Sequence, residues 1–153
     1  VDLFSYLFGS ITTVTNIDLL VITTLGIVVL AIVVSVYKEF VYVSFDEEAA
    51  HVSGVPTKTL NMLLMILTAL TVSISMRIVG ILLIGALMVI PVVTAMQLRQ
   101  SFLKTILASI LFSFIAVIAG LFLSYYVNLA AGGTIVVISL FLFAVTALMT
   151  SKK

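Results

Sequence analysis

The stretch Thr105–Ser151, TILASILFSFIAVIAGLFLSYYVNLAAGGTIVVISLFLFAVTALMTS, contains no Asp, Glu, Lys or Arg. As a single helix it would be roughly 70 Å long at about 1.5 Å per residue, more than twice the roughly 30 Å hydrocarbon core of a bilayer. The chain must therefore turn back once, and Asn128–Gly133, NLAAGG, is the helix-breaking sequence that supplies the turn. The stretch predicts two transmembrane helices, at 105–127 and 134–150.

The rest of the chain has the same apolar character. Its 153 residues are 63% hydrophobic and 8% charged, whereas a soluble domain is about 25% charged, which excludes a water-soluble globule. Further apolar runs cover 19–37, 60–76 and 78–98. We therefore expect an all-α, polytopic transmembrane helical bundle of about five spans. Residues 1–18, rich in aromatic and small polar side chains, are expected to form an outer interfacial segment, and residues 38–58 a cytoplasmic loop.

Several classes of chemistry are excluded by what the sequence lacks. Without cysteine there is no disulfide framework, thiolate metal site or redox motif. Without a nucleophile elbow, a phosphate-binding glycine loop or an HExxH helix, we expect no catalytic residue and no nucleotide site in this chain. The net charge of +1 gives no indication of nucleic acid binding. The chain begins with Val1 and no basic leader, so we expect a segment of a longer polypeptide, or a processed or engineered chain.

The positive charges predict an orientation. Five crossings place successive loops on alternating sides, with Arg77 alone on one side. The other side receives Lys38, Lys58, Arg99, Lys104, Lys152 and Lys153. Because cytoplasmic loops carry an excess of Lys and Arg, we expect the N-terminus outside and the C-terminus in the cytoplasm.

The polar segment Lys38–Lys58 could be a chemical site or a scaffold. Glu47 and His51 lie one helical turn apart and form a usable pair of metal ligands, but two ligands do not close a site. The alternative, which we favour, is a short surface helix with acidic residues in its first turn and with Gly54 and Pro56 ending it. The residues of this cytoplasmic motif are Phe45, Asp46, Glu47, Glu48, His51 and Gly54.

The second and third apolar runs hold the polar and helix-bending residues of the spans. Arg77 is either an interfacial residue or part of the outer mouth of a pathway. Pro91 is either a hinge or a simple bend satisfied by a neighbouring hydroxyl. We expect these two spans to line a pathway. The pathway candidates are Asn61, Thr68, Thr71, Ser75, Arg77, Gly80, Gly85 and Pro91.

Small residues recur every three or four positions along the fourth run. Such a face lets another helix approach closely, so it indicates packing and not catalysis. Its members are Ser109, Ser113, Ala116, Gly120 and Ser124.

Several stretches together resemble the permease subunit of the bacterial ABC transporters that import zinc, manganese or iron. They are FDEEAAHVSGVP (Phe45–Pro56), RIVGILLIGALMVIPVVTA (Arg77–Ala95), SYYVNLAAGGTIVV (Ser124–Val137) and, more weakly, YLFGSI (Tyr6–Ile11). The resemblance implies a fold like that of the vitamin B12 importers, with residues 1–153 as a single segment from the C-terminal portion of the permease. The N-terminal spans, and any metal-contacting residues they supply, are missing from this sequence.

The same resemblance implies the partners and the mode of action. Two permease copies form the channel in the cytoplasmic (inner) membrane, surrounded by lipid. ABC ATPase subunits dock from the cytoplasm, and an extracytoplasmic metal-binding protein delivers the divalent cation, which is transported and not held as a cofactor. The implied ATPase-coupling contact is the loop after the Pro91 helix, with the acidic segment alongside it. The coupling residues are Gln97, Arg99, Gln100, Ser101, Phe102 and Lys104.

Other functions stay open on the residues alone. A stand-alone ion channel or secondary carrier is disfavoured because no Asp or Glu lies inside a predicted span. An ABC permease for a metal chelate and a membrane scaffold without transport are the remaining alternatives.

Overall fold

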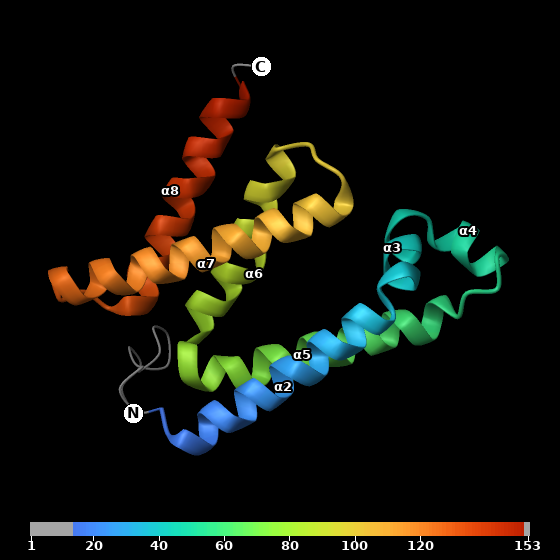
Figure 1. Ribbon diagram of the computed structural model, residues 1–153, viewed down its shortest axis with the longest axis horizontal. Coiled ribbons are helices and arrows are strands. Elements are labelled where there is room, and N and C mark those ends of the chain that lie inside the picture. Colours follow the sequence, from blue (N-terminus) through green and yellow to red (C-terminus); the bar gives the residue numbers. More distant parts are fainter. Residues whose placement is uncertain (1–13, 152–153) are drawn as a thin grey trace. The chain divides into compact units, whose positions relative to one another are not determined.

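The computed structural model describes residues 14–151, which are helical apart from short connections (Figure 1). The helices are α2 (Asn16–Ser35), α3 (Tyr37–Phe45), α4 (Glu47–Val52), α5 (Thr57–Val79), α6 (Ile81–Gln97), α7 (Phe102–Val127) and α8 (Ala131–Ser151). Helices α2, α5, α7 and α8 are long and apolar enough to cross a membrane, and α6 is a shorter apolar helix. With no strand among the described residues, the predicted all-α bundle of about five spans is confirmed.

Helix α2 begins at Asn16, earlier than the span predicted from residue 19. Thr15 and Asp18 form a capping box: the Thr15 amide donates to Asp18 Oδ2 at 3.0 Å, and the Asp18 amide donates to Thr15 Oγ1 at 3.3 Å. Asp18 is thus a first-turn residue, where the helix dipole favours an acid. The rest of the expected interfacial segment, residues 1–13, lies outside the described residues.

Hydroxyl side chains in the long helices bond back to their own backbone. Each donates to the carbonyl four residues earlier, at 2.7–2.9 Å, as seen for Thr23, Thr68, Thr71, Ser113, Ser139 and Thr146. Such bonds satisfy a hydroxyl without water or a neighbouring helix.

The chain divides into two compact units. In the N-terminal unit, Val14–Ser75, α3 packs against α2 and α4. Its small core consists of Val43, Ala50 and Leu60, one from each of α3, α4 and α5. The described part of the C-terminal unit is residues 76–151, in which α6, α7 and α8 all pack on one another around Leu83, Ala116 and Ile135.

Helices α7 and α8 approach one another closely at Gly120. A Cβ atom at this position would lie 2.7 Å from the Cα atom and 3.0 Å from the amide nitrogen of Ile135, and would overlap the Ile135 side chain. Ala116 is fully buried one turn earlier on the same face. The face of small residues predicted in the fourth run is therefore a packing face, and α8 is its partner.

Two turns depend on residues with a positive backbone φ angle. Gly80, at φ 90° and ψ 153°, separates α5 from α6. The predicted NLAAGG turn is confirmed but shorter, because Gly132 and Gly133 belong to α8. Asn128 takes the left-handed conformation at φ 54°, and the Ser124 hydroxyl donates to the Leu129 carbonyl at 2.6 Å. Asn is one of the few residues other than glycine that visits this region readily.

Candidate functional site

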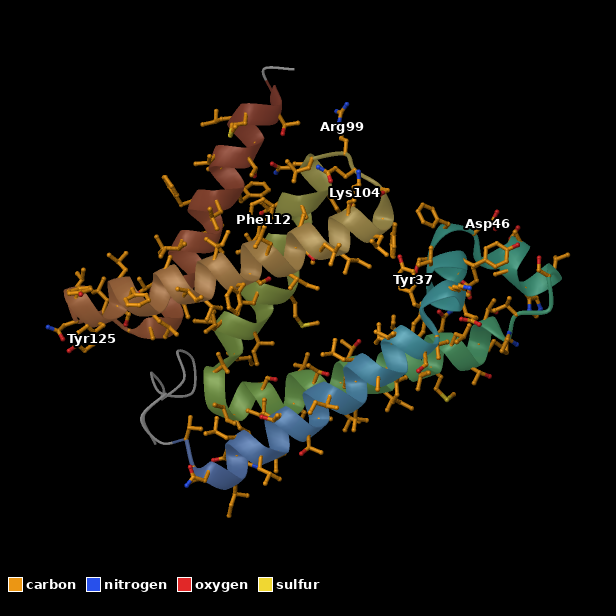
Figure 2. All side chains as sticks on the ribbon, in the orientation of Figure 1. Tyr37, Asp46, Arg99, Lys104, Phe112 and Tyr125 are labelled. Carbon is orange, nitrogen blue, oxygen red and sulfur yellow. The ribbon has the colours of Figure 1, made fainter. Side chains whose placement is uncertain are left out.

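The acidic segment forms a capped helix. Asp46, at the junction of α3 and α4 (Figure 2), accepts a hydrogen bond at Oδ1 from the Ala49 amide at 2.9 Å. Glu47 and Glu48 occupy the first turn of α4 and His51 the last, the arrangement that the helix dipole favours. Gly54 follows at φ 85°. A helix from Asp46 to Gly54 was expected, and α4 occupies Glu47–Val52 of it.

The Glu47 carboxylate of α4 has a structural partner and does not belong to a metal site. Among residues 14–151, no group of three or more His, Cys, Asp or Glu side chains is placed to hold a metal ion. Glu47 Oε1 instead accepts a hydrogen bond from Asn61 Nδ2 at 2.8 Å. This bond ties α4 to the first turns of α5.

Helix α3 was missed by sequence reasoning. Tyr42 on α3 approaches the end of α4, with its hydroxyl 2.9 Å from Ser53 Oγ and donating to the Ala49 carbonyl at 3.3 Å. The apolar residues Phe40 and Val43 face the Ala50 side of α4. Their spacing of three residues is a helical signal that the sequence did contain.

Beyond this small core, the α3–α4 segment exposes apolar side chains. Phe45 is 72% exposed and Val52 is 87% exposed, on a segment that carries several charged residues and lies between two long apolar helices. Exposed apolar side chains rimmed by polar ones mark interaction sites more often than isolated apolar residues do. We call the surface formed by Phe45, Val52 and the α4 carboxylates the α4 surface.

The predicted coupling loop is a tight turn from Gln97 to Lys104. Gln97 ends α6, and Phe102 begins α7 after Ser101 at the N-cap position. Arg99 has a left-handed backbone at φ 49°, and its amide donates to the Met96 carbonyl at 3.1 Å. Arg99, Gln100 and Ser101 are exposed. Lys104 lies in the first turn of α7, where a cation is disfavoured by the helix dipole.

The pathway candidates are divided between the two units. Asn61, Thr68, Thr71 and Ser75 lie in the N-terminal unit, spaced so that they share one face of α5. The hydroxyls of Thr68 and Thr71 donate to their own helix, which leaves their oxygen lone pairs as acceptors. Asn61 is already bonded to Glu47, so a pathway role for its amide would compete with that bond.

The remaining pathway candidates lie in the C-terminal unit. Arg77 is exposed in the last turn of α5, which extends past it to Val79. Pro91 is buried inside α6, which is continuous from Ile81 to Gln97, and the nearby Thr94 hydroxyl donates to the Ile90 carbonyl at 2.6 Å. A Cβ atom at Gly85 would meet nothing within 4 Å.

Replacing Asn61 by leucine is expected to loosen α4 from α5. Loss of the bond to Glu47 should destabilise this local contact by about 0.5–1.5 kcal/mol. Hydrogen exchange of the Ala49 and Ala50 amides should become faster in Asn61→Leu. In Glu47→Gln, which keeps an acceptor oxygen, exchange should change little; equal acceleration in both variants would contradict the assignment.

The family described as the ABC 3 transport family matches residues 1–150, so the chain belongs to that family. It is 37% identical to a probable metal transport system membrane protein of Treponema pallidum, covering 97% of this chain and 56% of that protein.

Two relatives have names that state a metal. The chain is 36% identical to the high-affinity zinc uptake system membrane protein ZnuB of Haemophilus influenzae, over 95% of this chain and 56% of that protein. It is 33% identical to the manganese transport system membrane protein MntC of Listeria monocytogenes, over 99% of this chain and 54% of that protein. The chain thus spans about half the length of the curated relatives it matches.

Proposed function

We propose that this chain is part of the permease subunit of an ATP-driven importer of divalent metal cations, with zinc, manganese or iron as the cargo. The match to the ABC 3 transport family over residues 1–150 carries this proposal, and the zinc and manganese relatives support the substrate class. The permease moves the ion without covalent chemistry, and ATP hydrolysis belongs to a partner subunit.

The assembly follows from that role. Two copies of the full permease form the pathway in the bacterial inner membrane, two ATPase subunits dock on the cytoplasmic side, and an extracytoplasmic metal-binding protein delivers the cation. The distribution of Lys and Arg supports a cytoplasmic location for the α3–α4 segment, the Gln97–Lys104 turn and the C-terminus. Co-purification with an ATPase subunit tests this assembly; metal transport by the purified permease without any ATPase would contradict it in favour of a channel or carrier.

The pathway is proposed to run along α5 and α6. The oxygen atoms of Thr68, Thr71 and Ser75 supply weak ligands along one face of α5, and such ligands suit a passing ion better than a resident one. Single-cysteine variants at these positions should react with water-soluble thiol reagents, with metal slowing the reaction. If the three positions react only with lipid-soluble reagents, the face contacts lipid and the proposal is wrong.

Two surfaces are candidates for ATPase coupling: the α4 surface and the Gln97–Lys104 turn implied by the resemblance. We propose that the α4 surface makes the larger contribution and the turn the smaller one. The support is that Phe45 and Val52 are exposed on a segment fixed by its own core and by the Glu47–Asn61 bond. A docking element that transmits force has to be both exposed to its partner and firmly attached to a span.

The variant Val52→Lys tests which of the two surfaces contributes more to ATPase coupling. Because Val52 is exposed and ends α4, a lysine there leaves the fold intact and suits the helix dipole. We expect ATP-dependent metal uptake in vesicles to fall by about tenfold or more, equivalent to about 1.4 kcal/mol of lost docking energy. Arg99→Asn, which tolerates the left-handed backbone, should reduce uptake much less. If Arg99→Asn reduced uptake more than Val52→Lys does, coupling would be assigned to the Gln97–Lys104 turn.

A further inference from the structure

Residues 76–153 carry cations and no acidic side chain. They contain no Asp or Glu, yet they include Arg77, Arg99, Lys104, Lys152 and Lys153. Arg99 and Lys104 lie at the same turn between α6 and α7 (Figure 2). No carboxylate within residues 76–153 is therefore available to pair with these two cations.

Lys104 lies at the N-terminal end of α7, where the helix dipole repels a positive charge, so an anion bound at this turn would relieve an unfavourable placement. Arg99 has φ 49°, a left-handed backbone that glycine and asparagine adopt far more readily, and such strained conformations cluster at functional sites.

A cavity lies beside the turn. Its volume is about 280 Å³, and its lining consists of Gln97, Arg99, Ala147 and Thr150, from the end of α6, the turn and the end of α8. This volume lies just below the range of typical ligand sites, roughly 300–1,000 Å³, and the cavity is shallow and open. The lining offers a guanidinium, an amide and a hydroxyl, and no carboxylate.

Gln97 adds a second and independent sign of a ligand. Its Oε1 atom is buried and has no hydrogen-bond partner among the described residues. Buried acceptors are nearly always paired. The same side chain lines the cavity, and rotation about its soft terminal torsion would let the oxygen accept a hydrogen bond from a ligand there. A ligand that fills the cavity therefore has to donate a hydrogen bond as well as carry negative charge.

We propose that this cavity binds the head group of an anionic phospholipid that bears a free hydroxyl, such as phosphatidylglycerol. The phosphate pairs with the Arg99 guanidinium in the field of Lys104, the head-group hydroxyl donates to Gln97 Oε1, and Thr150 contributes a second polar contact. The position favours a lipid over a soluble phosphate because α8 is an apolar helix of membrane-spanning length that ends at this cavity. Basic pockets between helix ends lie at the depth of the head groups.

Native mass spectrometry of the intact permease in detergent tests this site without any ATPase present. The protein is titrated with phosphatidylglycerol, with phosphatidylmethanol, which keeps the charge and lacks the hydroxyl, with phosphatidylcholine, and with glycerol 3-phosphate. We expect phosphatidylglycerol to be retained in preference to phosphatidylmethanol by roughly two- to tenfold, as one hydrogen bond allows. Phosphatidylcholine and glycerol 3-phosphate should be retained least.

Two variants assign the binding to this cavity. Arg99→Asn should weaken retention of both anionic lipids by about tenfold or more, because a charge-assisted contact is lost. Gln97→Leu should be at least as stable without lipid, since an unpaired buried acceptor is removed, and should abolish the preference for phosphatidylglycerol over phosphatidylmethanol. Arg77→Gln, outside the cavity, is the matched control and should change neither.

Three outcomes would overturn the proposal. Retention of phosphatidylcholine equal to that of the anionic lipids would remove the charge requirement. Displacement of the lipid by glycerol 3-phosphate at similar concentration would assign the cavity to a soluble phosphate compound. Equal loss of lipid in Arg99→Asn and Arg77→Gln would show that the cations act only through general charge.

Discussion

Replacing Gly120 by valine is expected to prevent α7 from packing on α8 and to leave little folded permease. The first added carbon already falls 2.7 Å from the Cα atom of Ile135, so the neighbour that has to move is backbone and not a flexible side chain. The valine methyl groups add to that overlap. Overpacking of a helix contact commonly costs 1–3 kcal/mol, and with a backbone neighbour we expect about 3 kcal/mol or more. Thermal unfolding in detergent, followed by size-exclusion chromatography, measures this loss.

Gly120→Ala provides the graded comparison and Gly85→Ala the control. The alanine variant carries the same first overlap without the methyl branches, so its loss should be large but smaller than that of valine. At Gly85 a Cβ atom meets nothing within 4 Å, and the replacement in a helix interior should be neutral or stabilising by about 0.5–1 kcal/mol. Equal stability of Gly120→Val and Gly85→Ala would contradict the observed α7–α8 packing.

Gly80→Ala is expected to be the second most damaging change, because of the backbone conformation at this position. At φ 90° and ψ 153°, Gly80 occupies a region that is essentially restricted to glycine, and forcing another residue into it costs about 1–3 kcal/mol. The variant should therefore unfold at a lower temperature, or the start of α6 should shift. Exchange of the Ile84 amide, which donates to the Gly80 carbonyl at 3.3 Å, reports the local change.

Substitutions that involve asparagine distinguish the turn at Asn128 from the turn at Gly80. Asn128 lies at φ 54° and ψ 40°, in the left-handed helical region, so Asn128→Gly should be tolerated. The ψ value of Gly80 lies outside that region, so Gly80→Asn should be as damaging as Gly80→Ala. If asparagine restored stability at position 80, the conformation described for Gly80 would be wrong.

The transmembrane helices could be predicted because their signals are local. An uncharged stretch longer than a bilayer is thick has to contain two helices, and NLAAGG is the place where it can turn. The close approach at Gly120 was also foreseeable, since a face of small residues has no other use in lipid. Its partner helix was not foreseeable, because nothing in the residue types on α7 specifies α8.

The candidate site was harder to predict because its contacts join distant residues. In the sequence, Asn61 is a polar residue in an apolar run. No periodic pattern of residue types predicts its hydrogen bond to Glu47. Helix α3 is short and rich in β-branched and aromatic residues, so it depends on packing against α4 and α5 more than on intrinsic propensity. The left-handed backbone of Arg99 has no signal in the sequence, since arginine is an unusual residue for that conformation.

The hydroxyl groups that donate to carbonyls of their own helices have a consequence for membrane insertion. Thr23, Thr68 and Thr146 each complete their bonding within one turn, as do the serines described with them. A span whose polar groups are satisfied internally can leave the translocon and enter lipid alone. Assembly then becomes a second stage, in which already inserted helices find their neighbours laterally. For this chain, we expect the meeting of α7 with α8 at Gly120 to be such a late event, so defects there should appear after synthesis and insertion, as proteins that reach the membrane and are then degraded.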